Sequence, residues 1–220
     1  AKLNVADFSN MKVGLGWRLN IMQSMVPQSF YHDGETIEGY VYTDETGAES
    51  YFKLSKDNIF TDIETETLEY DSTNRVMTIG DDKYSFDAIG RLISISDKYE
   101  NTMSITYTAG LITSVTDGAG RDFVFDYSNN YLRTITAPDG TIYECIYSVD
   151  HLTSLQLNYM YNEFHYVENS QISKVVLTDV GSLYVKEVRY EYANNRLSSA
   201  SEYSWRRVPL PLISKSTYDY

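Results

Sequence analysis

The sequence predicts an all-β fold in which tandem β-hairpins form a curved or spiralling antiparallel sheet. Three observations support this prediction. The chain has 21 tyrosines among its 220 residues, and tyrosine favours half-buried pleated surface. Aromatic or apolar residues recur in pairs spaced by two, which places both members of a pair on one face of a strand. No stretch carries the sustained apolar stripe and caps of a helix, so we expect helix to be scarce.

The predicted hairpins follow one another along the chain with a fixed period. Each begins with a pair of aromatic or apolar residues: Tyr84/Phe86, Ile105/Tyr107, Phe125/Tyr127, Cys145/Tyr147, Phe164/Tyr166 and Tyr190/Tyr192. An apolar anchor follows each pair: Leu92, Leu111, Leu132, Leu152, Ile172 and Leu197. Successive anchors are 19, 21, 20, 20 and 25 residues apart. A period of about 20 residues is typical of a repeat protein, in which each unit stacks on its neighbours.

Turn residues separate the strands within and between these repeats. They lie at residues 87–90, 108–110 and 128–130 before the anchors, and at residues 97–101, 117–120 and 137–140 after them. Each unit therefore reads as strand, turn, strand, turn. Leu92 and Ile95 are three positions apart, which would put them on opposite faces of a regular strand. Either Leu92 ends the turn or a bulge separates the two residues, and both alternatives bend the sheet.

Composition and charge exclude several classes of protein. The formal net charge is -13 and the sequence pI is about 4.6, which argues against nucleic acid or an anionic membrane surface as the main partner. The sequence has no apolar run long enough for a transmembrane helix, and we expect no signal peptide in it. The single cysteine, Cys145, excludes an internal disulfide framework and a multi-cysteine zinc site.

The repeating segments resemble the YD or Rhs repeat, whose pattern is aromatic-x-Tyr-Asp-x-x-Gly-Arg-Leu-x-x-Ile-x-Asp. Residues 84–97 match this pattern most closely, and a variant copy that begins at Tyr70 has Asn74 in place of the turn glycine. Residues 110–121 and 138–140 continue the pattern, whereas the units at Ile172 and Leu197 keep the anchor and lose the glycine. Upstream, residues 14–20 resemble the glycine-tryptophan lead-in that precedes such arrays, and residues 218–220 begin a further copy.

The family that this chain resembles includes bacterial Rhs and wall-associated proteins, the shell components of insecticidal toxin complexes, and the teneurin ectodomains. The resemblance implies a spiralling sheet that winds into a hollow shell, often around a C-terminal toxin or variable domain. Seven hairpins at about 4.8 Å per strand give a sheet roughly 70 Å wide, too narrow to close around a folded cargo. We therefore expect an arc of a larger chain. The sequence has no Asp-Pro dipeptide, so the resemblance does not extend to the family's self-cleavage.

These observations predict a non-enzymatic structural scaffold, a segment of the shell of a large secreted or surface-exposed bacterial protein. We expect a lead-in β segment at residues 1–65, an array of about seven repeats at 66–205, and a proline-containing loop with the start of another repeat at 206–220. No cofactor and no metal are expected. The expected partners are the rest of the same large chain, with further repeats and a toxin cargo, and a second copy that pairs through exposed sheet edges.

The site residues that the resemblance indicates are structural repeat positions and not catalytic groups. They are Tyr70, Asp71, Tyr84, Phe86, Asp87, Gly90, Arg91, Leu92, Tyr107, Gly110, Leu111, Tyr127, Leu132, Tyr147, Leu152, Tyr166, Ile172, Tyr192 and Leu197. The alternative function is a carbohydrate-binding or adhesion module of a wall-associated protein, because exposed aromatic stripes beside carboxylates suit stacking on sugars. A hydrolase comes third, since nothing in the sequence singles out one pair of acids.

Other chemistry-bearing residues have structural interpretations. His32, His151 and His165 lack the spacing of a metal site, and Cys145 alternates with tyrosines in a predicted strand, which indicates a buried, inert thiol. Glu64 and Glu66 alternate with threonines, which predicts the solvent-facing side of a strand or a guarded sheet edge. The basic, proline-bearing stretch at residues 206–211 predicts a loop or an edge that interrupts pairing.

Overall fold

A computed structural model describes residues 11–158, 160–167, 171–180, 184–206 and 212–217. The described residues form 19 β-strands and no helix, as predicted. The described part of the chain thus contains no helix with the length and hydropathy needed to cross a membrane. Residues 207–211 and 218–220, on which the predicted proline loop and the further repeat depend, lie outside the described residues.

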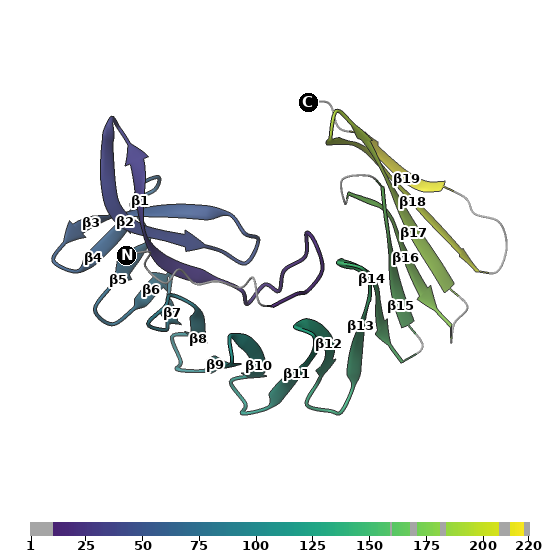
Figure 1. The fold of residues 1–220 in the computed structure, drawn as a ribbon, viewed down its shortest axis with the longest axis horizontal. Coiled ribbons are helices and arrows are strands. Elements are labelled where there is room, and N and C mark those ends of the chain that lie inside the picture. The colour runs from purple at the N-terminus through teal and green to yellow at the C-terminus, as the bar shows by residue number, and fades with distance from the viewer. Residues whose placement is uncertain (1–10, 159, 168–170, 181–183, 207–211, 218–220) are drawn as a thin grey trace. The chain divides into compact units, whose positions relative to one another are not determined.

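The strands are short and follow one another in chain order (Figure 1). They are β1 (Ser24–His32), β2 (Glu35–Thr43), β3 (Glu49–Lys56), β4 (Ile59–Asp62), β5 (Glu69–Asp71), β6 (Val76–Ile79), β7 (Asp82–Phe86), β8 (Leu92–Ser96), β9 (Thr102–Thr108), β10 (Leu111–Thr116), β11 (Asp122–Ser128), β12 (Tyr131–Thr136), β13 (Ile142–Ser148), β14 (His151–Leu157), β15 (Met160–Tyr166), β16 (Ile172–Asp179), β17 (Tyr184–Ala193), β18 (Arg196–Arg206) and β19 (Leu212–Thr217).

The described chain folds as two compact units. The first unit holds Arg18–Val124, and the second holds Lys12–Trp17 together with the described part of Phe125–Tyr220. Within the first unit each strand pairs antiparallel with the next one, from β1–β2 to β10–β11. Within the second unit the same holds from β12–β13 to β18–β19. The prediction of an all-β fold made of successive antiparallel hairpins is therefore confirmed.

Of the two alternatives for the Leu92 region, the structure shows the bulge. In the β7–β8 hairpin Ser85 pairs with Ser94 and Phe86 with Leu92, so Ile93 is an extra residue that has no partner on β7. The same shift of one residue, directly after the anchor, recurs in four later hairpins. It leaves out Thr113, Thr153, Ser173 and Ser198. A bulge of this kind bends its strand and increases the local twist.

The core of the first unit is rich in aromatic rings and methionine. Phe52, Met25, Met77, Leu92, Ile112 and Val41 are its most deeply buried side chains. The ring of Tyr40 meets Phe60 edge-on at 4.7 Å and Tyr70 at 4.8 Å between centroids, and Tyr70 meets Phe86 at 6.1 Å. Edge-to-face geometry is the arrangement that aromatic quadrupoles favour. Each ring comes from a different strand, so the cluster ties β2, β4, β5 and β7 together.

The core of the second unit is a row of smaller residues contributed by successive hairpins. Phe125, Leu132, Cys145, Leu152 and Val176 are buried. Cys145 pairs with Leu155 on the neighbouring strand, which places the cysteine in the position that Ile105 takes in the first unit, where Ile105 pairs with Val115. The two hairpins therefore share this buried position and fill it with different side chains.

Candidate functional site

The repeated feature of this fold is a contact between the last aromatic residue of one strand and the anchor of the next. Because the bulge follows the anchor, the two residues face each other directly. The pairs are Phe86–Leu92, Tyr107–Ile112, Tyr147–Leu152, Tyr166–Ile172 and Tyr192–Leu197. The predicted positions Phe86, Leu92, Leu132 and Leu152 are buried, whereas Tyr84, Tyr107, Tyr127, Tyr147, Tyr166, Ile172, Tyr192 and Leu197 are half-buried.

In two repeats the buried anchor lies one residue after the leucine position of the repeat pattern, which falls on Leu111 and on Val76. The structure places the anchor at Ile112, which is fully buried, and Leu111 instead pairs with Thr108 beside the turn. The two-residue turn Ala109-Gly110 has positive φ at both positions and ends at Gly110, as predicted, so the difference lies in which of the two apolar residues after the turn is buried. In the repeat that begins at Tyr70, Tyr70 is buried and pairs with Met77, which is the buried anchor of that repeat.

A ladder of tyrosine hydroxyls connects one hairpin to the preceding hairpin. The Tyr107 hydroxyl donates to the carbonyl of Leu92 at 2.9 Å, and the Tyr166 hydroxyl donates to the carbonyl of Leu152 at 2.6 Å. The Tyr192 hydroxyl donates to the carbonyl of Ile172 at 2.7 Å. Each acceptor is the anchor of the repeat before. Sequence reasoning missed this ladder, although the preference for tyrosine over phenylalanine at these positions was a signal for it.

Two tyrosines of the series do not form this bond. The hydroxyls of Tyr127 and Tyr147 are buried and have no hydrogen-bond partner among the described residues. Burial raises the pKa of both hydroxyls, and the neighbouring Cys145 thiol raises the pKa of Tyr147 further. Burial likewise raises the pKa of the Cys145 thiol. A buried thiol with a raised pKa is a poor nucleophile.

Where the bulge residue carries a hydroxyl, it adds a side-chain hydrogen bond within its hairpin. The Thr153 hydroxyl donates to the carbonyl of Ile146 at 3.1 Å, and the Ser198 hydroxyl donates to the carbonyl of Glu191 at 3.0 Å. The Ser173 hydroxyl reaches the carbonyl of His165 at 3.2 Å. In each case the acceptor belongs to the residue before the repeat tyrosine. A hydroxyl residue after the anchor therefore satisfies a backbone carbonyl at the bulge.

Aspartates at the turns act as caps for the turn backbone. The Asp87 carboxylate accepts from the backbone N–H groups of Ile89 at 3.0 Å and of Arg91 at 2.9 Å. It also accepts from the Arg91 guanidinium at 2.7–2.8 Å. Gly90 has a φ of 88°, and a Cβ there would lie 2.2 Å from the Met25 carbonyl oxygen. The Asp-x-x-Gly-Arg pattern is thus a requirement of this turn.

The same turn recurs between β10 and β11. Asp117 accepts from the backbone N–H groups of Ala119 and Arg121 and pairs with the Arg121 guanidinium at 2.7 Å. The hydrogen bond from Arg121 holds the pKa of the Asp117 carboxyl below its ordinary value. Asp71 caps its turn through Thr73 and Asn74, and the bonds from Asn74 lower the pKa of Asp71. These carboxylates are saturated by their own turns.

The acidic stretch after β4 does not form a strand. Glu64 and Glu66 lie in the loop between Asp62 and β5, so the interpretation as a solvent-facing strand is wrong. Asp62 is 3% exposed, and its carboxylate accepts from the backbone N–H groups of Thr65, Thr67 and Leu68 at 2.7–2.9 Å. Burial opposes ionisation of Asp62, but these bonds outweigh it and lower its pKa. The loop is therefore built around one buried carboxylate.

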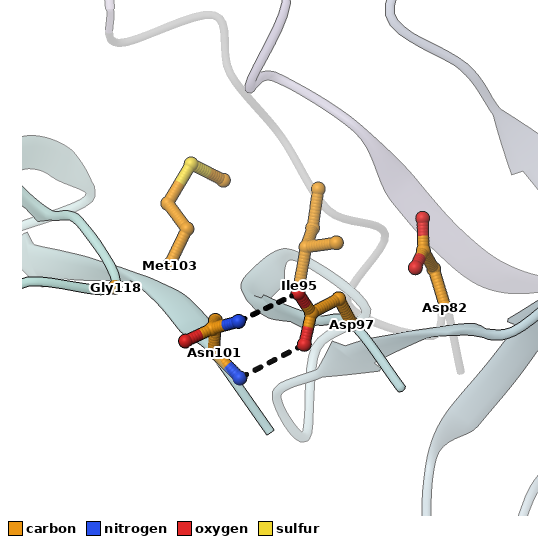
Figure 2. A pocket seen from close by; sticks show the side chains of 6 residues that line it. All are labelled: Asp82, Ile95, Asp97, Asn101, Met103 and Gly118. Carbon is orange, nitrogen blue, oxygen red and sulfur yellow. Dashed lines mark hydrogen bonds between the residues drawn. The ribbon is translucent and has the colours of Figure 1, made fainter. Parts of the chain in front are cut away.

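A hollow of about 270 Å³ lies beside the start of β7 and the turns that follow β8 and β10. Asp82, Ile95, Asp97, Asn101, Met103 and Gly118 line it. Figure 2 shows the Asp97 carboxylate held by Asn101 through its backbone N–H at 2.9 Å and its side-chain amide at 2.8 Å. The amide bond from Asn101 lowers the pKa of Asp97. A carboxylate committed in this way caps a turn and is poorly placed to act as a general acid.

The histidines are distributed over three strands, with His32 in β1, His151 in β14 and His165 in β15. The His151 ring packs on Tyr166 at 4.6 Å between centroids, and His32 lies 3.3 Å from the exposed Asp33 carboxylate. Within the described ranges, no group of three or more His, Cys, Asp or Glu side chains is arranged to hold a metal ion.

Comparison with protein-family models finds no match, and comparison with curated proteins finds none. Solved structures that are similar to this chain include the complex TcdB2-TccC3-Cdc42, at 13% identity over 79% of this chain and 11% of that chain, with a TM-score of 0.45. The Tc holotoxin pore of Photorhabdus luminescens is similar at 14% identity over 82% of this chain and 10% of that chain, with a TM-score of 0.42. A structure of TcdB2-TccC3 without its hypervariable C-terminal region is similar at 12% identity over 76% and 11% of the two chains, with a TM-score of 0.37. The chain spans about a tenth of the length of these structures, and the similarities are too distant to define a family.

Proposed function

We propose that this chain is a non-enzymatic scaffold, a segment of a large YD/Rhs-repeat shell in a secreted or surface-exposed bacterial protein. The observation that carries the proposal is the bond from a repeat tyrosine to the anchor carbonyl of the preceding hairpin, as from Tyr107 to Leu92 and from Tyr166 to Leu152. Such a bond fastens each hairpin to the one before it. The repeated side chains bind neighbouring hairpins to one another, and a wall built from repeats depends on such contacts between neighbours.

The role of that wall is to enclose or present a C-terminal toxin or variable domain. Its support is the resemblance of residues 84–97 to the YD repeat, whose family builds such shells. The remainder of the shell, with its further repeats and cargo, is the partner that this role requires. Cryo-electron microscopy of the full parent chain tests it: a closed β-sheet wall that contains these repeats would support the role, and an open catalytic cleft lined by them would contradict it.

The scaffold itself is tested by removing one repeat in register. Ile95 pairs with Met103 on β9, and Val115 pairs with Phe123 on β11. Deletion of residues 102–121 would therefore bring Ile95 opposite Phe123 in the same register. We expect this variant to fold as an antiparallel sheet with a lower melting temperature, because one set of stacking contacts is lost. The out-of-period deletion of residues 102–111 should fail to fold.

Circular dichroism and thermal unfolding distinguish the two deletions. If the in-register deletion unfolded at the same temperature as the full chain, the repeats would not support one another and the scaffold proposal would fail. If both deletions abolished folding equally, the chain would be a single irregular domain and not a modular array.

The alternative function, a carbohydrate-binding or adhesion module, needs tyrosine rings exposed side by side. The hydroxyls of Tyr107, Tyr166 and Tyr192 are bound to backbone carbonyls, which limits their use in binding sugars, so we place this alternative second. A glycan-array screen of the chain tests it directly. Reproducible binding that is lost on substituting an exposed ring, such as Tyr99→Ala, would move it to first place.

A further inference from the structure

The segment Lys12–Trp17 is a peptide from one part of the chain that is bound by another. It belongs to the second unit, although the residues that follow it belong to the first. The backbone N–H of Lys12 donates to the carbonyl of Asn130 at 2.9 Å, and the carbonyl of Lys12 accepts from the N–H of Leu132 at 2.9 Å. The N–H of Leu15 donates to the carbonyl of Asp150 at 2.8 Å. Lys12 thus pairs with a hairpin end as one residue of an added strand, and the chain then turns, with the N–H of Trp17 donating to the carbonyl of Gly14 at 3.0 Å.

Side chains fix the two ends of this docked segment. The indole Nε1 of Trp17 donates to the Tyr166 hydroxyl at 2.9 Å, and its ring meets Phe164 edge-on at 4.6 Å. At the other end the Lys12 ammonium lies 4.7 Å from the centre of the Tyr131 ring. The Tyr166 hydroxyl is the one that also donates to Leu152. Trp17 is therefore joined to the tyrosine ladder.

A glycine is required in the middle of the segment. Gly14 has a φ of 105°, and a Cβ there would lie 2.9 Å from the Leu152 Cβ and 3.0 Å from the Leu152 nitrogen. Any side chain would both strain the backbone and push the segment off the anchor. By contrast Leu15 is 53% exposed, so its side chain points away from the surface that holds the segment. The site therefore requires glycine at the position of Gly14 and leaves the side chain at the position of Leu15 free to vary.

The same pair of backbone groups binds a crossing segment elsewhere. In the first unit Met25 donates its N–H to the carbonyl of Gly90 at 2.8 Å, and Leu92 donates its N–H to the carbonyl of Gln23 at 3.0 Å. These are the groups of an anchor and of the residue two positions before it, as at Leu132 and Asn130. The crossing strand is parallel at Tyr131 and antiparallel at Arg91. Hairpin ends of this fold thus pair with a crossing residue in either chain direction.

We propose that the hairpin ends at residues 130–132 and 150–152, with the rings of Phe164 and Tyr166, form a peptide-binding groove specific for a glycine-x-glycine-tryptophan turn that follows one strand-paired residue. In the folded chain its own segment Lys12–Trp17 occupies the groove. A peptide of the same sequence binds in trans once that segment is displaced. Tethering gives the chain's own segment an effective concentration of the order of millimolar, so the intact chain masks the groove. The inference is independent of the shell role.

Fluorescence polarisation with a labelled peptide of residues 11–20 tests the groove in the full chain. The variant Gly14→Ala/Trp17→Ala, which releases its own segment, should bind the peptide, and the wild-type chain should bind it roughly tenfold or more weakly because the tethered segment competes. A peptide that carries Gly14→Ala alone should bind neither protein. Equal binding by variant and wild type, binding that ignores the Gly14→Ala change, or no binding by the folded variant would overturn the proposal.

Amide hydrogen exchange on the wild-type chain keeps the proposal testable if the variant does not fold. The amides of Lys12 and Leu15 should be protected, and excess unlabelled peptide should accelerate their exchange. The Met25 amide, bonded at the Leu92 hairpin end, serves as the control and should not respond. Exchange of Lys12 and Leu15 at the rate of a free peptide, or no change on adding peptide, would overturn the groove.

Discussion

Hairpins with a bonded tyrosine hydroxyl and hairpins without one are built on the same plan. Tyr166 faces Ile172 and bonds the carbonyl of Leu152, whereas Tyr147 faces Leu152 and has no partner for its hydroxyl among the described residues. The strand pairing, the bulge and the ring burial are retained in both. The difference indicates that packing of the ring on the anchor is what the fold requires, and that the hydroxyl bond adds to it.

Substitutions at the anchors, which both kinds of hairpin share, should have the largest effect on stability. Leu92→Ala and Leu132→Ala should each lower the free energy of unfolding by about 2–5 kcal/mol, because each side chain is buried and its removal leaves a cavity. Urea unfolding measures the loss, and hydrogen exchange assigns it to one unit or the other. Leu54→Ala, at a residue that is 55% exposed, is the control and should change stability little. An anchor variant as stable as this control would contradict the packing argument.

Removal of the tyrosine hydroxyl should affect the stability of the two kinds of hairpin differently. Tyr166→Phe should lower the free energy of unfolding by about 1–3 kcal/mol, because it leaves the Leu152 carbonyl and the Trp17 indole without a partner. Tyr127→Phe should be neutral or slightly stabilising, since it removes a buried hydroxyl that has no bond. Urea unfolding measures both variants. Equal losses would mean that the hydrogen bond of the tyrosine hydroxyl does not contribute to stability.

The sequence was sufficient to predict the elements that depend on periodicity. The spacing of Ile105 and Tyr107 placed both on one face of β9, and the three-residue spacing of Leu92 and Ile95 anticipated the bulge as one of two alternatives. The anchor at Ile112 could not be distinguished from Leu111, because both residues are apolar and the choice depends on which of them pairs with Tyr107 across the hairpin.

Contacts between residues far apart in the sequence could not be predicted from it. Trp17 lies 149 residues from Tyr166, and no periodic pattern connects a lead-in tryptophan with a repeat tyrosine. The buried cap at Asp62 was also missed, because alternating acids and threonines in the following loop imitate the pattern of a solvent-facing strand. In both cases the deciding interaction is a hydrogen bond to one specific group and not a periodic burial of apolar surface.

Alkaline pH should destabilise the hairpins, and the buried Tyr127 and Tyr147 should contribute to that loss. Burial raises the pKa of Tyr127 and Tyr147, so the folded chain keeps these protons where the unfolded chain begins to lose them. Stability is therefore unaffected below a pH of about 10 and falls as the pH rises above it. The double variant Tyr127→Phe/Tyr147→Phe should lose stability less steeply in urea titrations between pH 9 and 12. An identical pH dependence of the two proteins would show that these hydroxyls do not titrate with unfolding.

The smallest effect concerns the turns, where a single residue differs between otherwise equivalent hairpins. Val149 has a φ of 54° in the turn where Asn129 and Asn194 have φ values of 51° and 52°. A left-handed conformation costs a β-branched residue roughly 1–2 kcal/mol, and asparagine tolerates it. Val149→Asn should therefore raise the free energy of unfolding by about 1 kcal/mol, since the side chain is 87% exposed and little packing is lost. The reverse change Asn129→Val should lower it by a similar amount, and if the two substitutions shifted the urea midpoint in the same direction, backbone strain would not be what distinguishes these turns.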